Sequence, residues 1–415
     1  MIKNKLIKTL GIYTLSNLID KVIPFLLLPF LTRFLTKSEY GLLANYQSML
    51  QFVLPIVGIN AASAYTKHYF NKDFNQDKYI SACLRLLLIT SAFSLAGIYG
   101  LSSIIEEYTQ VPKSVYWTVV LYSFFHNFSD ILLAKWRVKY QATKFAVFKI
   151  LRTSIEALLS ILLILSFDQN WLGRVEAQVI AYSIFGLVTY YLLNQDVKFS
   201  FTDVNTQLSR IKKYGLPLIP HVLGAVIIGQ TDKIFVTKMV GIDYNGVYSA
   251  AFQIGMVMSL FSNSFNQAWV PWFFEQLNLK SNSANKKIVK ITYLYILGIF
   301  FLISVFTFFG PLLFKILGSE FRSGIDFFFW IILGFGFNAI YKMFVNYIFY
   351  TEKTIYIAYL AIGTALSNII LNYVLIKEFG AIGAAYATTV SFAIQLIATI
   401  IITTKTYKMP WVKIK

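Results

Sequence analysis

Charged and polar side chains lie inside long apolar stretches of this 415-residue sequence, at spacings that place them on common helix faces. In the first stretch Asp20 and Lys21 follow Asn17 by three and four residues, so the three side chains share one face of a helix. A charge at the centre of a membrane-spanning helix costs about 2.5–3.5 kcal/mol, so such residues usually face a cavity or a partner. The pattern therefore predicts a polar cavity or buried ion pairs within an apolar helical bundle.

Further charged residues recur in later apolar stretches. Arg152 lies in the fifth stretch, Asp232 and Lys233 in the seventh, and Lys342 in the tenth. Two structural interpretations compete with a cavity role. In one, Asp232 forms a structural ion pair with Lys21 or Lys233. In the other, Lys149 and Arg152 extend to lipid headgroups at the cytoplasmic end of the fifth span. The Asn and Ser residues of the fourth and eleventh stretches are better explained as hydrogen bonds between helices, worth about 0.6 kcal/mol each.

Cysteine and histidine give neither a metal site nor a catalytic site. The single cysteine, Cys83, cannot form an internal disulfide, and His68, His126 and His221 lie on separate elements without metal-ligand spacing. We therefore expect no metal and no cofactor. An enzyme is disfavoured on a separate ground, the short connections on the outer side.

The composition shows which elements must position these residues. Of all residues 57% are hydrophobic and only 13% are charged, far from the composition of a soluble domain. A membrane-spanning helix needs roughly 20 mostly apolar residues, and about twelve such stretches recur along the chain. We predict an all-α membrane protein whose spans are 10–31, 40–65, 80–104, 115–134, 145–167, 171–193, 216–239, 247–274, 288–309, 325–350, 355–376 and 382–404.

The basic residues predict an orientation. Lysine and arginine total 37 against 19 acidic residues, and with a cytoplasmic N-terminus most of them fall in cytoplasmic connections. This bias predicts that both termini are cytoplasmic and that anionic membrane lipids, not nucleic acid, are the partners of the net charge of +18. The predicted outer connections hold Arg33, Lys37, Lys113, Arg174, Lys238, Lys315, Arg322 and Lys377.

The sequence also repeats itself. A shift of about 205 residues sets Phe30, Thr32, Arg33, Phe34, Leu35 and Gly41 over Phe235, Thr237, Lys238, Met239, Val240 and Gly246. We predict two six-helix bundles, 1–200 and 201–415, joined by a cytoplasmic connection at 194–213. Six spans is an even number, so the halves would be related by a pseudo-two-fold axis along the membrane normal. Residues 33–41 would form a turn facing outward.

These segments resemble a known family. The stretches "LPFLTRFLTKSEYGLLA", "QTDKIFVTKMVGIDYNGVYSAA" and "FGAIGAAYAT" are similar to lipid-linked oligosaccharide (O-antigen type) flippases of the multidrug/oligosaccharidyl-lipid/polysaccharide exporter superfamily. The resemblance covers essentially the whole chain. It implies two six-helix bundles around a central cavity, alternating access to the two membrane faces, and a bacterial cytoplasmic (inner) membrane location.

The leading hypothesis is a flippase for an undecaprenyl-pyrophosphate-linked oligosaccharide, an O-antigen or capsule repeat unit. A pyrophosphate carries about two negative charges, and one Lys–phosphate contact at about 4 Å is worth on the order of 4 kcal/mol at an effective dielectric of about 20, before desolvation. We therefore assign Lys21 and Lys233 as central pyrophosphate contacts. Arg152 and Lys342, which lie toward the cytoplasmic side, would receive the substrate.

Other residues receive supporting roles in this hypothesis. Asp20 and Asp232 would balance the charge of the empty cavity or bind a coupling H⁺ or Na⁺, Gln51 and Gln253 would contact sugar, and Arg33 and Lys238 would lie at the outer mouth. The alternatives are a cation-coupled multidrug-type antiporter and a membrane polysaccharide polymerase or acyltransferase. Cations along the route disfavour the antiporter, and the short outer connections disfavour the enzymes.

Overall fold

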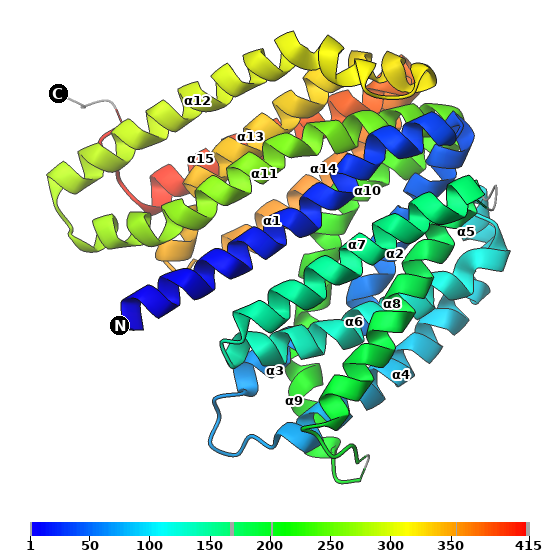
Figure 1. Ribbon diagram of the computed structural model, residues 1–415. Helices are drawn as coiled ribbons and strands as arrows, with labels where there is room; N and C mark the ends of the chain where they lie inside the picture. The colour runs from blue at the N-terminus through cyan, green and yellow to red at the C-terminus, as the bar shows by residue number, and fades with distance from the viewer. Residues whose placement is uncertain (1, 167–169, 201, 354, 412–415) are drawn as a thin grey trace. The chain divides into compact units, whose positions relative to one another are not determined.

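Helices cover the twelve predicted spans as far as the structure describes them. Ile59 and Asn60 interrupt the second span, Leu101 interrupts the third, and Phe167, the last residue of the fifth, lies outside the described residues. The structure, a computed structural model, describes residues 2–166, 170–200, 202–353 and 355–411, with the side chains of 2–10 and of His221 outside the description. No strand occurs in these ranges (Figure 1). The helices are α1 (Ile2–Phe34), α2 (Lys37–Gly58), α3 (Ala61–His68), α4 (Gln76–Gly100), α5 (Ser102–Thr109), α6 (Tyr116–Val138), α7 (Ala142–Ser166), α8 (Trp171–Asn194), α9 (Asn205–Gly215), α10 (Ile219–Met239), α11 (Ile242–Asn278), α12 (Asn282–Lys315), α13 (Ile325–Tyr350), α14 (Ile355–Phe379) and α15 (Ile382–Thr406).

The lengths and composition of these helices fit a membrane. In the described part of the chain, eight helices are long and apolar enough to cross one, and the bent pair Asn205–Leu218 and Val222–Met239 makes a ninth if it counts as one span. Three further helices, α6, α7 and α11, are as long, but polar and charged residues interrupt their apolar sequence. The predicted all-α membrane fold is confirmed, and the three interrupted helices carry much of its intramembrane polarity.

Contacts between helices divide the chain into two compact units, Met1–Val226 and Ile227–Lys415. In the first unit α6 packs on α2, α4 and α8, and α8 packs on α7. In the second unit α13 packs on α11, α12 and α15, and α15 packs on α14. The same four pairings therefore occur in the same chain order, as two copies of one six-helix bundle require. The axis relating the halves and the domain limit at residue 200 stay predictions.

A capping box makes the turn between the first two spans. Thr36 Oγ1 accepts a hydrogen bond from the Glu39 backbone N–H at 3.3 Å, and the Glu39 carboxylate accepts one from the Thr36 backbone N–H at 2.8 Å. These bonds satisfy groups that the start of α2 would otherwise leave unpaired. The turn predicted within 33–41 is confirmed, whereas its outward orientation stays a prediction.

Asn127 holds two helices of the first unit close together. Its side-chain amide donates to the carbonyls of Leu54 on α2 and of Ser123 on its own helix α6, at 3.1 and 2.8 Å. A Cβ on Gly58 of α2 would lie 2.0 Å from Asn127 Oδ1, so a larger residue there would displace the Asn127 amide from this position. In the second unit Asn368 of α14 donates to Ser391 of α15 at 3.4 Å. Both contacts fit the interhelical role predicted for the fourth and eleventh stretches.

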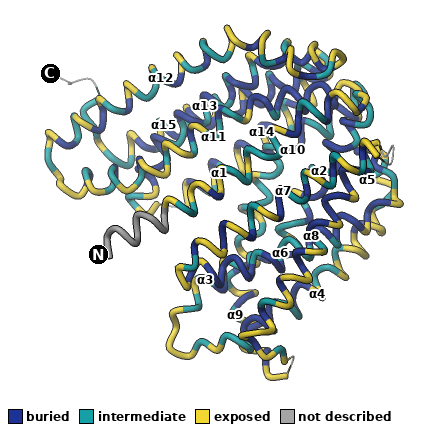
Figure 2. The backbone as a smooth tube through the Cα atoms, in the orientation of Figure 1, coloured by how far each residue is buried: buried dark blue, intermediate teal, exposed yellow. Residues whose placement is uncertain are grey.

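Exposed residues lie along the helices of both units (Figure 2), and many of them are large and apolar. Phe93 is 74% exposed and Phe308 is 78% exposed. A water-soluble protein rarely leaves many such surfaces uncovered. Lipid is therefore the solvent that these faces require.

Candidate functional site

The polar face predicted on α1 packs against α7 in the first unit. The Lys149 Nζ atom of α7 lies 2.9 Å from Asp20 Oδ2 and donates to Asn17 Oδ1 at 2.8 Å. The hydroxyl of Thr153 donates to Asp20 Oδ1 at 2.5 Å. Asp20 thus has a counter-charge on another helix, while the neighbouring Lys21 is exposed.

A second ion pair lies deeper between α7 and α8. Arg174 Nη2 is 2.5 Å from Glu156 Oε1, and each side chain is only 8% exposed. Arg174 also donates to Ser160 Oγ at 2.7 Å, and Gln178 donates to the same Glu156 oxygen at 3.3 Å. α8 begins at Trp171, where the sixth span was predicted to begin, so Arg174 lies in its first turn, and its guanidinium reaches Glu156 of α7. That this end of α8 lies on the outer side stays a prediction.

Arg152 lies on the same face of α7 as Lys149 and Glu156, which precede and follow it by about one helical turn. It is 3% exposed, and its guanidinium carbon stands 4.5 Å from the centre of the Tyr182 ring on α8. Its Nε and Nη1 atoms are buried without a hydrogen-bond partner. The alternative in which Arg152 extends to the headgroups is therefore wrong, because the side chain points into the bundle.

The Tyr182 ring beside this guanidinium belongs to an aromatic cluster. The rings of Tyr122 and Tyr182 are 4.3 Å apart between centroids, and His126 stacks on Tyr182 at 5.3 Å with an interplanar angle of 8°. His126 Nδ1 lies 3.6 Å from Asp130 Oδ2 one turn further along α6. Neither Tyr182 nor His126 was predicted to contribute to the site, although Tyr122, His126 and Asp130 share the i, i+4 spacing of one helix face.

Together these residues form the first-unit cluster: Asp20, Asp130, Lys149, Arg152, Glu156, Arg174, Tyr122, His126 and Tyr182. Three carboxylates offset three permanent cations, so the cluster is close to neutral while empty. Arg152 nevertheless keeps two buried nitrogen atoms, Nε and Nη1, without a hydrogen-bond partner, and a buried donor without an acceptor costs about 1–3 kcal/mol, more when charged. An incoming acceptor would remove this cost.

The second unit buries a carboxylate on α10. Asp232 is fully buried and accepts hydrogen bonds from the Tyr248 hydroxyl at 2.5 Å and the Lys233 backbone N–H at 2.9 Å. The Thr388 hydroxyl is 3.5 Å away. The Lys233 ammonium instead donates to Gln230 at 2.9 Å, and no ion pair between Asp232 and Lys233 occurs among the described residues. The structural ion-pair alternative for these two residues is wrong.

Lys342 of α13 faces α11. Its Nζ atom donates to Ser262 Oγ at 3.0 Å and to Asn263 Oδ1 at 2.6 Å. One turn further along, Asn346 donates to Asn266 at 2.9 Å. A polar row thus runs between these two helices of the second unit.

The remaining predicted site residues lie at more exposed positions. Gln51 is exposed on α2, and Gln253 is half-buried on α11. Arg33 and Lys238 are exposed in the last turns of α1 and α10, which are corresponding places in the two halves. Across the described residues no group of three His, Cys, Asp or Glu side chains has the geometry to hold a metal ion.

The profile of the family described as "Polysaccharide biosynthesis protein" matches residues 6–277. Protein 1 of the Lsg locus of Haemophilus influenzae is 27% identical over 361 residues, covering 84% of this chain and 86% of that protein. A membrane protein of the same organism is 29% identical over 357 residues, covering 84% of this chain and 85% of that protein.

Solved structures share the fold. The lipid II flippase MurJ in an inward closed conformation superposes with a TM-score of 0.72 at 15% identity, covering 94% of this chain and 86% of that one. An inward-facing multidrug resistance transporter of the MATE family, MOP superfamily, gives a TM-score of 0.68 at 16% identity and covers 95% of both chains.

Proposed function

The chain belongs to the family of polysaccharide biosynthesis proteins, and on that premise we propose that it is a flippase for a lipid-linked oligosaccharide. The family and the fold shared with MurJ support a multi-pass membrane flippase or transporter. The substrate that we propose is an undecaprenyl-pyrophosphate-linked O-antigen or capsule repeat unit. It would cross from the cytoplasmic to the outer leaflet of the bacterial inner membrane.

Arg152 is the observation that supports this substrate most. A buried guanidinium with two nitrogen atoms that lack a hydrogen-bond partner matches the oxygen acceptors of a phosphate, to which arginine binds in bidentate geometry. The neighbouring cations Lys149 and Arg174 are already paired with Asp20 and Glu156. Arg152 is therefore the cation of α7 best placed to bind an anionic ligand, because it would give up only its contact with the Tyr182 ring and no ion pair.

The other cations extend the route in this proposal. Lys233 and Lys342 are bonded to neutral amide or hydroxyl oxygens, which a phosphate can replace at low electrostatic cost. Lys21 is exposed on α1. Lys21 and Lys233 are the central pyrophosphate contacts, with Arg152 and Lys342 on the cytoplasmic side.

The polar residues without positive charge complete the site. Gln51 and Gln253 contact sugar, and Arg33 and Lys238 lie at the outer mouth. Asp20 balances charge through Lys149 while the cavity is empty. The two bundles expose the site alternately to each membrane face, and both termini are cytoplasmic.

One observation favours a second function, cation-coupled antiport. Asp232 is buried among hydroxyls and a backbone N–H and has no ion pair among the described residues, so it is available for H⁺ or Na⁺. The same group serves as the coupling site of a flippase. The two functions differ in the charge of the substrate. A buried arginine without hydrogen-bond partners suits an anionic substrate and would repel an organic cation.

Depletion of the protein in its host tests the proposal. Lipid-linked oligosaccharide should accumulate on the cytoplasmic leaflet, where an impermeant glycan label reaches it only in inverted vesicles. Re-expression of the wild-type chain should restore labelling of intact cells. Unchanged surface glycan and no accumulation after depletion would rule out the flippase, and resistance to organic cations lost at the same time would favour the antiporter.

A further inference from the structure

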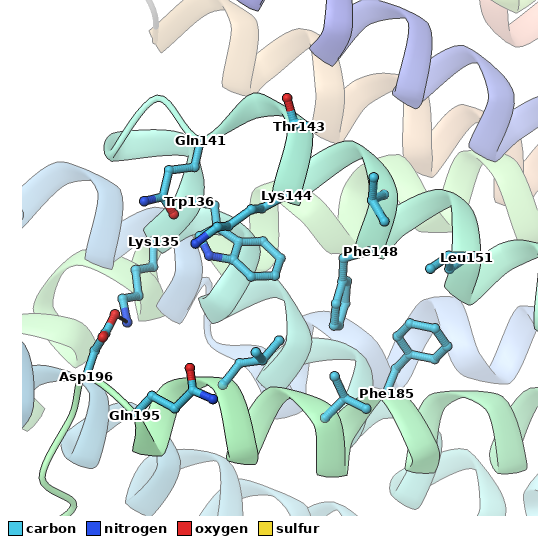
Figure 3. A pocket seen from close by; sticks show the side chains of 13 residues that line it. Lys135, Trp136, Gln141, Thr143, Lys144, Phe148, Leu151, Phe185, Gln195 and Asp196 are labelled. Atoms are coloured by element: carbon cyan, nitrogen blue, oxygen red, sulfur yellow. Dashed lines mark hydrogen bonds and ion pairs between the residues drawn. The ribbon is translucent and has the colours of Figure 1, made fainter.

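A pocket of about 460 Å³ lies between α6, α7 and α8 of the first unit, next to the connection that joins α6 to α7 (Figure 3). It is separate from the first-unit cluster, none of whose residues lines it. Polar side chains line one part of it and apolar side chains the other. The proposed function assigns it no role.

The apolar part follows single faces of two helices. On α7, Phe148 and Leu151 follow Lys144 by four and seven residues, so the three line one stripe. On α8, Phe185 and Leu192 are seven residues apart and line the facing stripe. Figure 3 shows Phe148, Leu151 and Phe185 together on the side away from the lysines. Seven residues of helix rise about 10 Å, so the stripe leads from a charged end to an apolar end along the helices.

The charged end carries more positive than negative charge. Lys135 is buried and lies 2.9 Å from Asp196, which follows α8 and is largely exposed. The hydrogen bond and charge of Lys135 lower the pKa of Asp196, and the charges of Lys139 and Lys144 lower it further. Two lysines, Lys135 and Lys144, and one carboxylate, Asp196, thus line this end of the pocket. Lys144 is exposed and forms no ion pair in the ranges that the structure describes.

The helices leave the apolar end open on one side. Leu151 is 49% exposed and Val188, which also lines the pocket, is 37% exposed. In a membrane these faces meet acyl chains. The charged end belongs to connections whose many lysines predict the cytoplasmic side, where anionic headgroups lie.

We propose that this pocket binds one anionic phospholipid of the cytoplasmic leaflet. The phosphate lies at Lys144, with the side-chain amides of Gln141 and Gln195 as further donors, and one acyl chain lies between α7 and α8. A free phosphate would leave the apolar stripe uncovered, and a zwitterionic lipid would bring its own cation to an end that already has an excess of lysine. The pocket thus selects for both an acyl chain and a net negative headgroup.

Trp136 provides a reporter for this site because it lines the pocket beside Lys144 (Figure 3). The full-length protein is reconstituted in phosphatidylcholine bilayers with increasing mole fractions of phosphatidylglycerol carrying brominated acyl chains, which quench tryptophan on contact. The Trp136 signal is the difference between the wild type and Trp136→Phe. We expect quenching that saturates at low mole fraction with brominated phosphatidylglycerol but not with brominated phosphatidylcholine.

Two variants and a matched control locate the site. Lys144→Gln should raise the half-saturating mole fraction about fivefold, since one basic residue near the surface contributes about that factor. Val188→Phe should reduce quenching by occupying the acyl stripe, without removing any charge. Lys290→Gln, an equally exposed lysine on α12 of the second unit, should leave the titration unchanged.

Three results would overturn the proposal. Equal quenching by both brominated lipids would mean unselective lipid contact. A titration curve of Lys144→Gln that matches the wild type would show that Lys144 does not bind the phosphate. Displacement of phosphatidylglycerol by a stoichiometric amount of lipid-linked oligosaccharide would assign the pocket to the transported substrate instead.

Discussion

The ion pair between Glu156 and Arg174 predicts a large and non-additive effect on stability. Both side chains are 8% exposed, and the shared Glu156 oxygen also accepts a hydrogen bond from Gln178. Removing one partner of such a buried pair costs about 3–5 kcal/mol, because the other charge stays buried without compensation. Arg174→Met should therefore lower the free energy of unfolding by about that amount.

The double variant separates the pair from its parts. Glu156→Gln combined with Arg174→Met removes both charges at similar volume, and we expect it to recover most of the loss, to within about 1–2 kcal/mol of the wild type. Stability is measured by denaturant titration of the purified protein in detergent, with the four chains of the cycle under identical conditions. If the stability loss of the double variant equals the sum of the losses of the two single variants, the two residues are not a coupled buried pair.

Three further predictions concern the cap, the pH response and the topology. Thr36→Ala removes the cap of α2 and should lower the free energy of unfolding by about 1 kcal/mol in the same titration. Because Lys135 lowers the pKa of Asp196, their pair stabilises the fold fully above the ordinary carboxyl pKa of about 3.9 and less as pH falls through the lower folded value. A titration between pH 7 and pH 3 should show this loss in the wild type and not in Asp196→Asn. In a Cys83→Ser background, cysteine at Asn205 should be labelled by an impermeant reagent only in inverted vesicles, and labelling in intact cells would reverse the predicted orientation.

The spans could be predicted because they depend on one-dimensional composition. Backbone groups in lipid must be satisfied within their own segment, so about 20 apolar residues form a helix whatever their tertiary partners are. The turn after α1 was equally local, since Thr36 and Glu39 make their capping bonds with each other. The repeat was readable for the same reason: both halves use matching turn residues near Arg33 and Lys238.

The partners within the site could not be predicted. Spacing identified Asn17 and Asp20 as one face of α1, but the rotation of α7 decides that Lys149 is their partner. Lys233 follows Asp232 directly, and successive residues of a helix point about 100° apart, so adjacency disfavours an ion pair. Only Glu156 could have indicated the role of Arg174. A carboxylate that deep in a span requires a cation, and Arg174 on the next span supplies it.

The most direct test of the central claim measures flipping by Arg152 variants in proteoliposomes that contain a purified undecaprenyl-pyrophosphate-linked oligosaccharide. An impermeant lectin added outside reports the glycan as it appears on the outer leaflet. In the proposed complex Arg152 pairs with the pyrophosphate, and truncating one member of such a buried charge pair costs about 2–5 kcal/mol. Arg152→Gln should therefore slow flipping at least about 30-fold. Arg152→Lys keeps the charge but loses the planar guanidinium, and its rate should lie between that of Arg152→Gln and the wild type. Arg137→Gln, which removes an exposed arginine of α6, serves as the matched control and should flip at the wild-type rate. Wild-type flipping by Arg152→Gln, in protein of normal stability, would contradict the account.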